Sequence, residues 1–130
     1  MGSREDSRGS QRPAGGFVRW LRSRRVVVDE ESMTPALLPG DRLLYDPGEY
    51  RDRSPAPGEI VVVTDPEAPR ELLIKRVGDS PLPLPPGAVW LVGDARDRSR
   101  DSRHFGPVAL RSVRGRAWLR YAPPQRRARL

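Results

Sequence analysis

Proline and glycine interrupt this chain so often that they limit the secondary structure it can form. The sequence has 15 prolines and 12 glycines among its 130 residues, spread along the whole length. Proline lacks a backbone donor and is excluded from helix interiors, and glycine weakens helices and strands alike. Long helices are therefore not expected, and the sequence predicts a mainly β fold of short strands joined by turns.

The predicted strands are short apolar runs bounded by turn residues. The clearest is residues 59–64, Glu-Ile-Val-Val-Val-Thr, which is rich in β-branched side chains. Residues 71–77 follow an Asp-Pro turn and are expected to pair with it as a hairpin. Four more strands are expected, at residues 26–28, 42–45, 89–92 and 113–121.

The length is that of one domain. Residues 1–16 contain almost nothing to bury, so they are predicted to form a disordered leader. A basic lead-in is expected at residues 17–25 and a basic tail at residues 124–130. Residues 26–123 between them are predicted to form a small single-domain β barrel or sandwich with little helix.

Composition excludes several kinds of chemistry. The chain has no cysteine, so it has no disulfide, thiolate nucleophile or cysteine-ligated zinc. Its only histidine, His104, cannot form a multi-histidine metal site, and no cofactor is expected. No apolar run of about 18 residues exists, so no transmembrane helix is expected. This favours a soluble, cytoplasmic protein, although residues 17–25 could lie on a membrane surface.

Lys75 is the only lysine of the chain, against 23 arginines. Arginine is always protonated, whereas a buried lysine can lose its proton. In a strand, Leu73, Lys75 and Val77 share one face, so the amine would lie among apolar side chains. Lys75 is therefore a candidate general base. A lysine on an edge strand, placed there by chance, is the alternative interpretation.

Ser32 is a candidate proton donor for that base. It lies between the strand at residues 26–28 and a predicted helical turn at residues 34–38. In that turn Thr34 is expected as the N-cap and Pro35 at the first helical position. A serine at such a bend can be exposed at a cleft edge. An ordinary loop or capping serine is the alternative interpretation.

The loop at residues 93–108 supplies a third polar group. Asp94, Asp101 and Arg103 can form a fixed set of ion pairs there, and Ser99 can hydrogen-bond an amine. A solvated loop of mixed charge is the alternative.

Together these segments resemble the type I signal peptidase family. The resemblance rests on four motifs in order, and it covers residues 26–123. They are Ser-Met-Thr-Pro-Ala-Leu at residues 32–37 with Gly40-Asp41, Lys75-Arg76-Val77, Gly93-Asp94, and Ser99 with residues 101–108.

The resemblance implies a serine endopeptidase with a Ser/Lys dyad on a largely β fold. By resemblance, Ser32 is the nucleophile and Lys75 the general base, and Ser99 orients the lysine amine. Met33 is expected to line the cleft. The supporting ion-pair residues are Asp94, Asp101, Arg103 and Arg76. The implied partner is a precursor protein that loses an N-terminal signal or pro-segment.

Three features depart from the family pattern. The family is normally anchored by an N-terminal transmembrane helix, which implies membrane association that this chain's sequence does not explain. Glu30 stands where other members have serine or glycine, and Ala95 stands where Asn is usual. The missing helix suggests the soluble branch that matures nickel-type superoxide dismutase. The sequence does not indicate the side of the membrane, the cleavage-site preference or the oligomeric state.

Other interpretations were weighed. A self-cleaving SOS-type repressor domain shares the Ser/Lys chemistry, but no helix-turn-helix pattern precedes the domain. A basic β barrel that binds nucleic acid is suggested by the net charge of +7, but the excess is concentrated at the chain ends, so nucleic acid is not expected as a partner. A catalytically inactive relative that binds a partner is kept open by Glu30 and Ala95.

Overall fold

The computed structural model describes residues 16–130, so the predicted disordered leader lies outside the described residues apart from Gly16. The described residues are mainly β, as the sequence predicted, and none of their helices is long and apolar enough to cross a membrane. Residues 16–22 are helical. The strands are β1 (Arg24–Val27), β2 (Arg42–Asp46), β3 (Ile60–Asp65), β4 (Ala68–Val77), β5 (Ala88–Val89), β6 (Leu91–Val92), β7 (Val108–Ala109), β8 (Val113–Ala122) and β9 (Ala128–Arg129). The short helical segments are η1 (Arg96–Arg98), α2 (Ser102–Phe105), η2 (Leu110–Ser112) and η3 (Pro124–Arg126).

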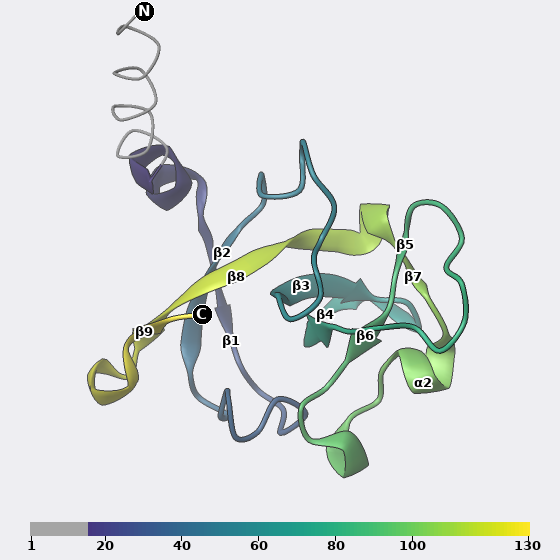
Figure 1. Ribbon diagram of the computed structural model, residues 1–130. Helices are drawn as coiled ribbons and strands as arrows, with labels where there is room; N and C mark the ends of the chain where they lie inside the picture. Colours follow the sequence, from purple (N-terminus) through teal and green to yellow (C-terminus); the bar gives the residue numbers. More distant parts are fainter. Residues whose placement is uncertain (1–15) are drawn as a thin grey trace, which may run out of the picture.

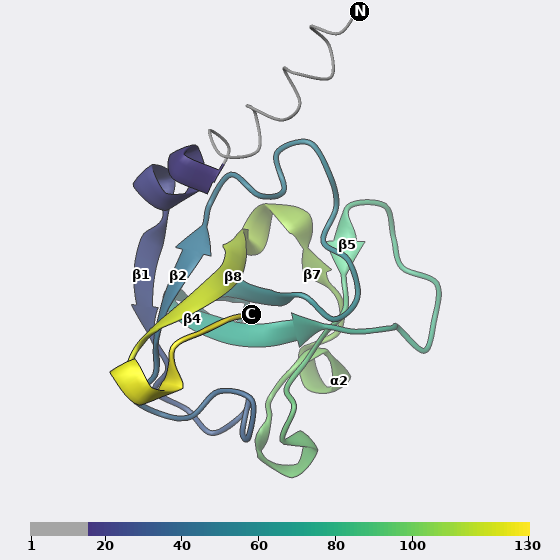
Figure 2. The same ribbon diagram turned by 60° about the vertical axis from the view of Figure 1, so that its left-hand side comes forward.

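One antiparallel sheet forms most of the domain. Its strands lie in the order β1-β2-β8-β3-β4-β6, and β9 pairs with β8. The long strand β8 pairs with β2 over one part and with β3 over another, and irregular register interrupts both ladders. Such bulges bend a strand and increase its twist, and the sheet is strongly curved (Figures 1 and 2). A second, two-stranded sheet joins β5 to β7.

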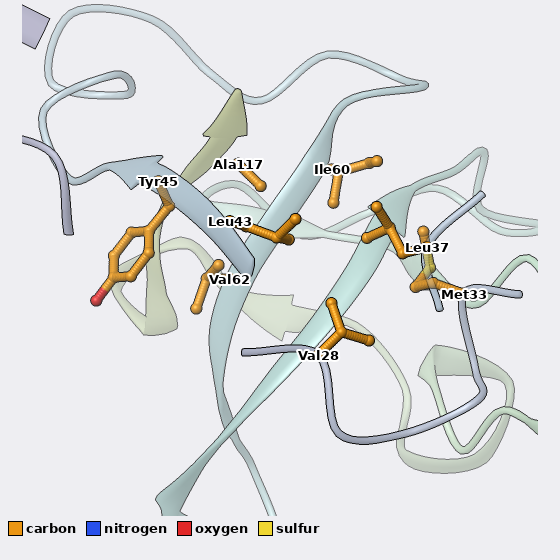
Figure 3. Close-up of a cluster of buried hydrophobic side chains, with 8 residues drawn as sticks. All are labelled: Val28, Met33, Leu37, Leu43, Tyr45, Ile60, Val62 and Ala117. Carbon is orange, nitrogen blue, oxygen red and sulfur yellow. The ribbon is translucent and has the colours of Figure 1, made fainter. Parts of the chain in front are cut away.

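Strand β3 is buried on both faces, which explains its continuous apolar sequence. Ile60 and Val62 face one hydrophobic cluster, and Val61 and Val63 face another. The first cluster also contains Val28, Met33, Leu37, Leu43, Tyr45 and Ala117 (Figure 3). The second also contains Leu73, Val77, Val89, Leu91 and Val108. The predicted hairpin is confirmed, since β3 and β4 pair antiparallel with Val61 opposite Lys75.

The structure corrects three sequence predictions. Residues 34–38 do not form a helix: residues 32–36 form a turn, with a cis Thr34–Pro35 peptide bond. The Leu37 N–H reaches the Met33 carbonyl, but the Leu38 N–H donates to the Asp41 carboxylate, so the helical hydrogen bonding does not continue.

The other two corrections concern residues 89–106. The single strand predicted at residues 89–92 is divided, because β5 and β6 belong to different sheets with Trp90 between them. The polar loop contains η1 and α2, and Asp101 is the N-cap of α2, since its side chain accepts from the Arg103 N–H. The His104 side chain accepts from the Asp101 N–H in return, so His104 completes a capping box.

In the main sheet, β1 and part of β4 each have an open strand edge among the described residues. β1 pairs only with β2. β4 pairs with β3 along its length, but on its other side β6 reaches only Arg76 and Val77. The backbone of β4 before Arg76 therefore has no strand on that side, and an edge of this kind can pair with an added peptide strand.

The C-terminal residues are attached to the domain at two places. β9 pairs with β8 through Leu119 and Arg120. Arg126 binds Asp41 through two nitrogen–oxygen contacts of 3.0 and 2.9 Å. Asp41 follows the turn that contains Ser32, so the C-terminal segment helps to fix that turn.

Candidate active site

Ser32 lies in the turn that follows β1, and apolar anchors on both sides hold this turn. Val28 before it exchanges backbone hydrogen bonds with Asp41 and Gly40. Met33 after it is 1% exposed and packs into the hydrophobic cluster of Figure 3. Ser32 itself is 4% exposed. Its position is therefore set by core packing on either side of it.

Lys75 is buried to 1% exposure on the face of β4 that also carries Leu73 and Val77. Burial lowers the pKa of Lys75 from its usual value, because the charged amine loses its hydration. The carboxylates of Glu30, Asp101 and Asp65 oppose this shift, and the Arg100 guanidinium adds to it. Burial is the largest effect, so the net shift of the Lys75 pKa is downward, toward the neutral amine.

The Lys75 amine is held by a neutral hydroxyl. Its Nζ donates to Ser99 Oγ at 3.2 Å, and Ser99 Oγ donates to Asp101 Oδ2 at 2.8 Å. Lys75 makes no salt bridge among the described residues. Because the Ser99 proton is directed to Asp101, Ser99 can only accept from the lysine. The lone pair of a neutral Nζ is therefore left for another donor.

Asp101 organises this region from a fully buried position. It accepts from the Gly93 N–H at 2.8 Å and from Arg103 Nε at 2.9 Å, in addition to Ser99. Burial alone would raise the pKa of Asp101, but the hydrogen bonds from Arg103, Gly93 and Ser99 hold it well below its usual value. Asp101 is thus a fixed anion that orients Ser99.

Gly93 is the point at which the turn of Ser32 meets Ser99. A Cβ added to Gly93 would lie 2.1 Å from Ser99 Oγ and 2.7 Å from the Ser32 carbonyl oxygen. The Ser32 carbonyl also accepts from the Ala95 N–H at 2.9 Å. The contact of Ala95 with the Ser32 turn is therefore made by its backbone. Only glycine allows the Ser32 turn and Ser99 to approach so closely.

Arg76 and Asp94 form a second ion pair beside this network. Arg76 Nε and Nη2 donate to the two carboxylate oxygens of Asp94 at 2.9 and 2.8 Å. Arg76 Nη1 also donates to the Gly58 carbonyl at 2.8 Å. A bidentate pair of this kind has a fixed geometry. It ties the end of β4 to the loop that carries Ser99.

A cleft opens beside Ser32. One wall is residues 26–30 with Ser32 and Met33, and the other is residues 71–74 of β4. The cleft thus lies between the two open strand edges. The sequence singled out Met33 as a lining residue, and Met33 contributes to this wall.

Some charged groups near Lys75 were not predicted from the sequence. Asp65 and Arg100 both act on its pKa and pair with each other, and Arg100 also pairs with Glu67. Glu30, considered only as a neighbour of Ser32, acts on Lys75 as well. Asp65 lies in the turn of the predicted hairpin, but no sequence signal indicated that Arg100 would reach it.

Comparison with known proteins gives consistent results. The profile of the family described as "Signal peptidase, peptidase S26" matches residues 14–82 and 78–122. The mitochondrial ATP-independent inner membrane protease subunit 1a of Arabidopsis thaliana is 35% identical over 117 residues, which span 75% of this chain and 70% of that protein. The mitochondrial inner membrane protease subunit 1 of Xenopus tropicalis is 38% identical over 114 residues, spanning 75% and 68%. The chloroplastic thylakoidal processing peptidase 1 of Arabidopsis thaliana is 27% identical over 142 residues, spanning 76% and 42%.

Proposed function

The chain belongs to the signal peptidase family, peptidase S26, and from this premise we propose that it is a Ser/Lys endopeptidase that removes an N-terminal segment from a precursor protein. Ser32 is the proposed nucleophile and Lys75 the proposed general base. The observation that carries the proposal is the hydrogen bond from buried Lys75 to Ser99, a neutral partner, where a carboxylate would have kept the lysine charged.

In the proposed first step, the neutral Lys75 amine takes the proton of the Ser32 hydroxyl. The Ser32 oxygen forms a bond to the carbonyl carbon of the scissile peptide, and the carbon–nitrogen bond breaks. The proton held by Lys75 passes to the departing amine. In the second step, Lys75 takes a proton from water as the water oxygen bonds to the acyl carbon, and the bond from that carbon to the Ser32 oxygen breaks. The proton held by Lys75 returns to the Ser32 oxygen, so the N-terminal segment leaves and both groups are regenerated.

The Ser32 N–H is a candidate donor to the oxyanion. It has no hydrogen-bond acceptor among the described residues, whereas the neighbouring Thr34 N–H donates to Glu31. A backbone N–H that is free and fixed can stabilise negative charge that develops on a peptide carbonyl oxygen. The Ser32 turn is fixed by the packing of Met33 and by the Ala95 N–H.

The experiment compares new N-termini produced by the wild type and by Ser32→Ala, each incubated with an extract that contains secretory and metalloenzyme precursors. Ser54→Ala, at an exposed serine in the loop after β2, is the matched control. We expect new N-termini with the wild type and Ser54→Ala only. Cleavage of nickel-type superoxide dismutase precursor alone would assign the maturation role. Identical profiles for folded wild type and Ser32→Ala would contradict the endopeptidase.

A second candidate function is a binding module without catalysis. Glu30 favours it, because a carboxylate near Lys75 raises the pKa of that lysine and opposes the neutral form. Binding of precursor peptides that are never cleaved would support this function in the same assay.

We also propose contact with a membrane surface. The relatives named above are inner membrane and thylakoidal proteases. In the helix at residues 16–22, Phe17, Trp20 and Leu21 are exposed by 63%, 55% and 65%. Exposed aromatic and aliphatic side chains on a helix are typical of interfacial binding. Sedimentation with anionic vesicles tests this, with Phe17→Ser/Leu21→Ser expected to reduce the bound fraction.

A further inference from the structure

The cleft beside Ser32 has a charge opposite to that of the chain. The chain carries a net charge of +7. All the charged residues that line the cleft are nevertheless acidic, namely Asp29, Glu30 and Glu71, and the remaining lining residues other than Ser32 are apolar. No arginine among the described residues lines this cleft, although the chain has 23 arginines.

These three carboxylates are not neutralised by neighbours. None of them takes part in a salt bridge among the described residues, although acidic residues close by do. Glu31 pairs with Arg98, and Asp65 pairs with Arg100. The charges of Asp29, Glu30 and Glu71 are thus available to a ligand in the cleft.

The carboxylates flank the site on both walls. Asp29 and Glu30 come just before Ser32 on one wall, and Glu71 lies on the other. Glu71 shares a face of β4 with Leu73 and Lys75, because side chains alternate along a strand. Glu71 precedes Lys75 by four strand positions, which correspond to about 13 Å. An extended peptide with its scissile bond at Ser32 would therefore reach Glu71 about four residues away.

A second observation also indicates a ligand in this cleft. Ser32 is 4% exposed and lines the cleft, yet its hydroxyl has no hydrogen-bond partner among the described residues. The Ser32 oxygen keeps some solvent exposure, because Arg116 Nε is the one fully enclosed side-chain nitrogen or oxygen without a partner among the described residues. The missing partner is consistent with a group that binds from the cleft.

We propose that the cleft selects peptides with an arginine or lysine within about four residues of the scissile bond, recognised by Glu71 together with Asp29 and Glu30. This inference rests on the proposed function, since it takes Ser32 as the position of the scissile bond. Each contact is a partly exposed ion pair, so we expect about a two- to fivefold preference per carboxylate. The preference should weaken at high salt.

Binding is measured in a Ser32→Ala background, so that the test does not depend on cleavage. The probes are fluorescently labelled, alanine-rich peptides with one arginine about four residues before or after the centre. Matched peptides carry citrulline, which has the shape of arginine but no charge. The variants are Glu71→Gln and, as a control, Asp52→Asn, at an exposed carboxylate outside the cleft.

We expect tighter binding of one arginine peptide than of its citrulline partner, and about a two- to fivefold reduction of that difference in Glu71→Gln but not in Asp52→Asn. Equal binding of arginine and citrulline peptides, or a preference that Glu71→Gln leaves intact, would overturn the inference. Cleavage of the same peptides by the wild-type chain is scored separately. Charge-selective binding without cleavage would refute the proposed function alone, and cleavage without charge selection would refute this inference alone.

Discussion

Two buried aspartates, Asp101 and Asp46, organise opposite parts of the molecule in similar ways. Each is fully buried, accepts a backbone N–H and binds arginine. Asp46 binds Arg22 through contacts of 2.6 and 2.9 Å and Arg19 through one of 3.3 Å. Each aspartate also lies beside a glycine, Gly93 or Gly115, that has no room for a side chain.

The two aspartates differ in how a second cation, besides one directly bound arginine, reaches the carboxylate. Around Asp46, both neighbouring cations are arginines that touch the carboxylate directly. Around Asp101, Lys75 reaches the carboxylate only through the hydroxyl of Ser99. A direct ion pair fixes a charge, whereas an intervening hydroxyl orients an amine and leaves it able to lose its proton. We infer that the Asp46 region stabilises the fold and the Asp101 region supports chemistry.

The largest expected effect on activity comes from exchanging lysine and arginine beside the two aspartates. Lys75→Arg keeps the charge but removes the base, because a guanidinium stays protonated. We expect kcat/KM for a cleavable peptide to fall about 10²- to 10⁴-fold. The converse exchange, Arg22→Lys beside Asp46, should leave kcat/KM within about twofold, since a lysine keeps the positive charge beside Asp46 and Arg22 lies outside the candidate active site. Equal losses in both variants, with both proteins folded by circular dichroism, would contradict the comparison.

Alanine at the two glycines should separate activity from stability. In Gly93→Ala the new Cβ would lie 2.1 Å from Ser99 Oγ, and in Gly115→Ala it would lie 2.3 Å from the Asp46 carbonyl oxygen. Crowding of this kind costs about 1–3 kcal/mol of unfolding free energy, measured by urea denaturation. We expect both variants to lose stability, but only Gly93→Ala to lose most of its activity when assayed at a temperature where it is folded.

Acid should destabilise the two regions alike. Burial raises the pKa of Asp46, but the hydrogen bonds from Arg22 and Gly48 lower it by more than burial raises it. The net shift of the Asp46 pKa is therefore downward, as it is for Asp101. Each ionised carboxylate therefore stabilises the fold above its unfolded pKa, and this stability is lost as the pH falls through the folded pKa. In Asp46→Asn and in Asp101→Asn, the slope of unfolding free energy against pH should decrease by at most about 1.4 kcal/mol per pH unit. An unchanged acid slope in either variant would show that its carboxylate does not contribute.

The smallest expected effect is a shift in the midpoint of kcat/KM against pH. The proposed mechanism uses neutral Lys75, so kcat/KM for an uncharged peptide should rise with pH and level off, with its midpoint below 10.5. Glu30 raises the pKa of Lys75, so Glu30→Gln should move the midpoint to lower pH. Glu49→Gln beside the Asp46 region, where Glu49 pairs with Arg19 and Arg53, should leave it unchanged. A midpoint that moves upward in Glu30→Gln would contradict this electrostatic picture.

Local sequence patterns predicted the parts of the fold that depend on neighbours in the chain. The hairpin of β3 and β4 follows from two apolar runs separated by an Asp-Pro turn. β8 was visible because its apolar residues alternate. The division of residues 89–92 between two sheets was not predictable, because it depends on β7, which contributes only two residues, Val108 and Ala109.

In the candidate site, the main residues could be predicted from the sequence, but most of their ion-pair partners could not. Lys75 was singled out as the only lysine, in an apolar strand, and Ser32 and Ser99 as polar groups in nearby segments; the family resemblance joined them, and their catalytic roles stay predictions. The partners of the ion pairs were harder to predict. Twenty-three arginines offer many choices for each carboxylate, and spacing alone does not reveal that Asp41 binds Arg126 or that Asp65 binds Arg100.

The open edges of β1 and β4 have a consequence for the behaviour of the protein in concentrated solution. An unpaired, apolar strand edge invites a second copy to add its own strand, which is a route to aggregation. The carboxylates at this opening are identical in every copy, so two copies that approach edge to edge repel each other. We therefore expect the acidic lining of the cleft to oppose association of two copies through these strand edges.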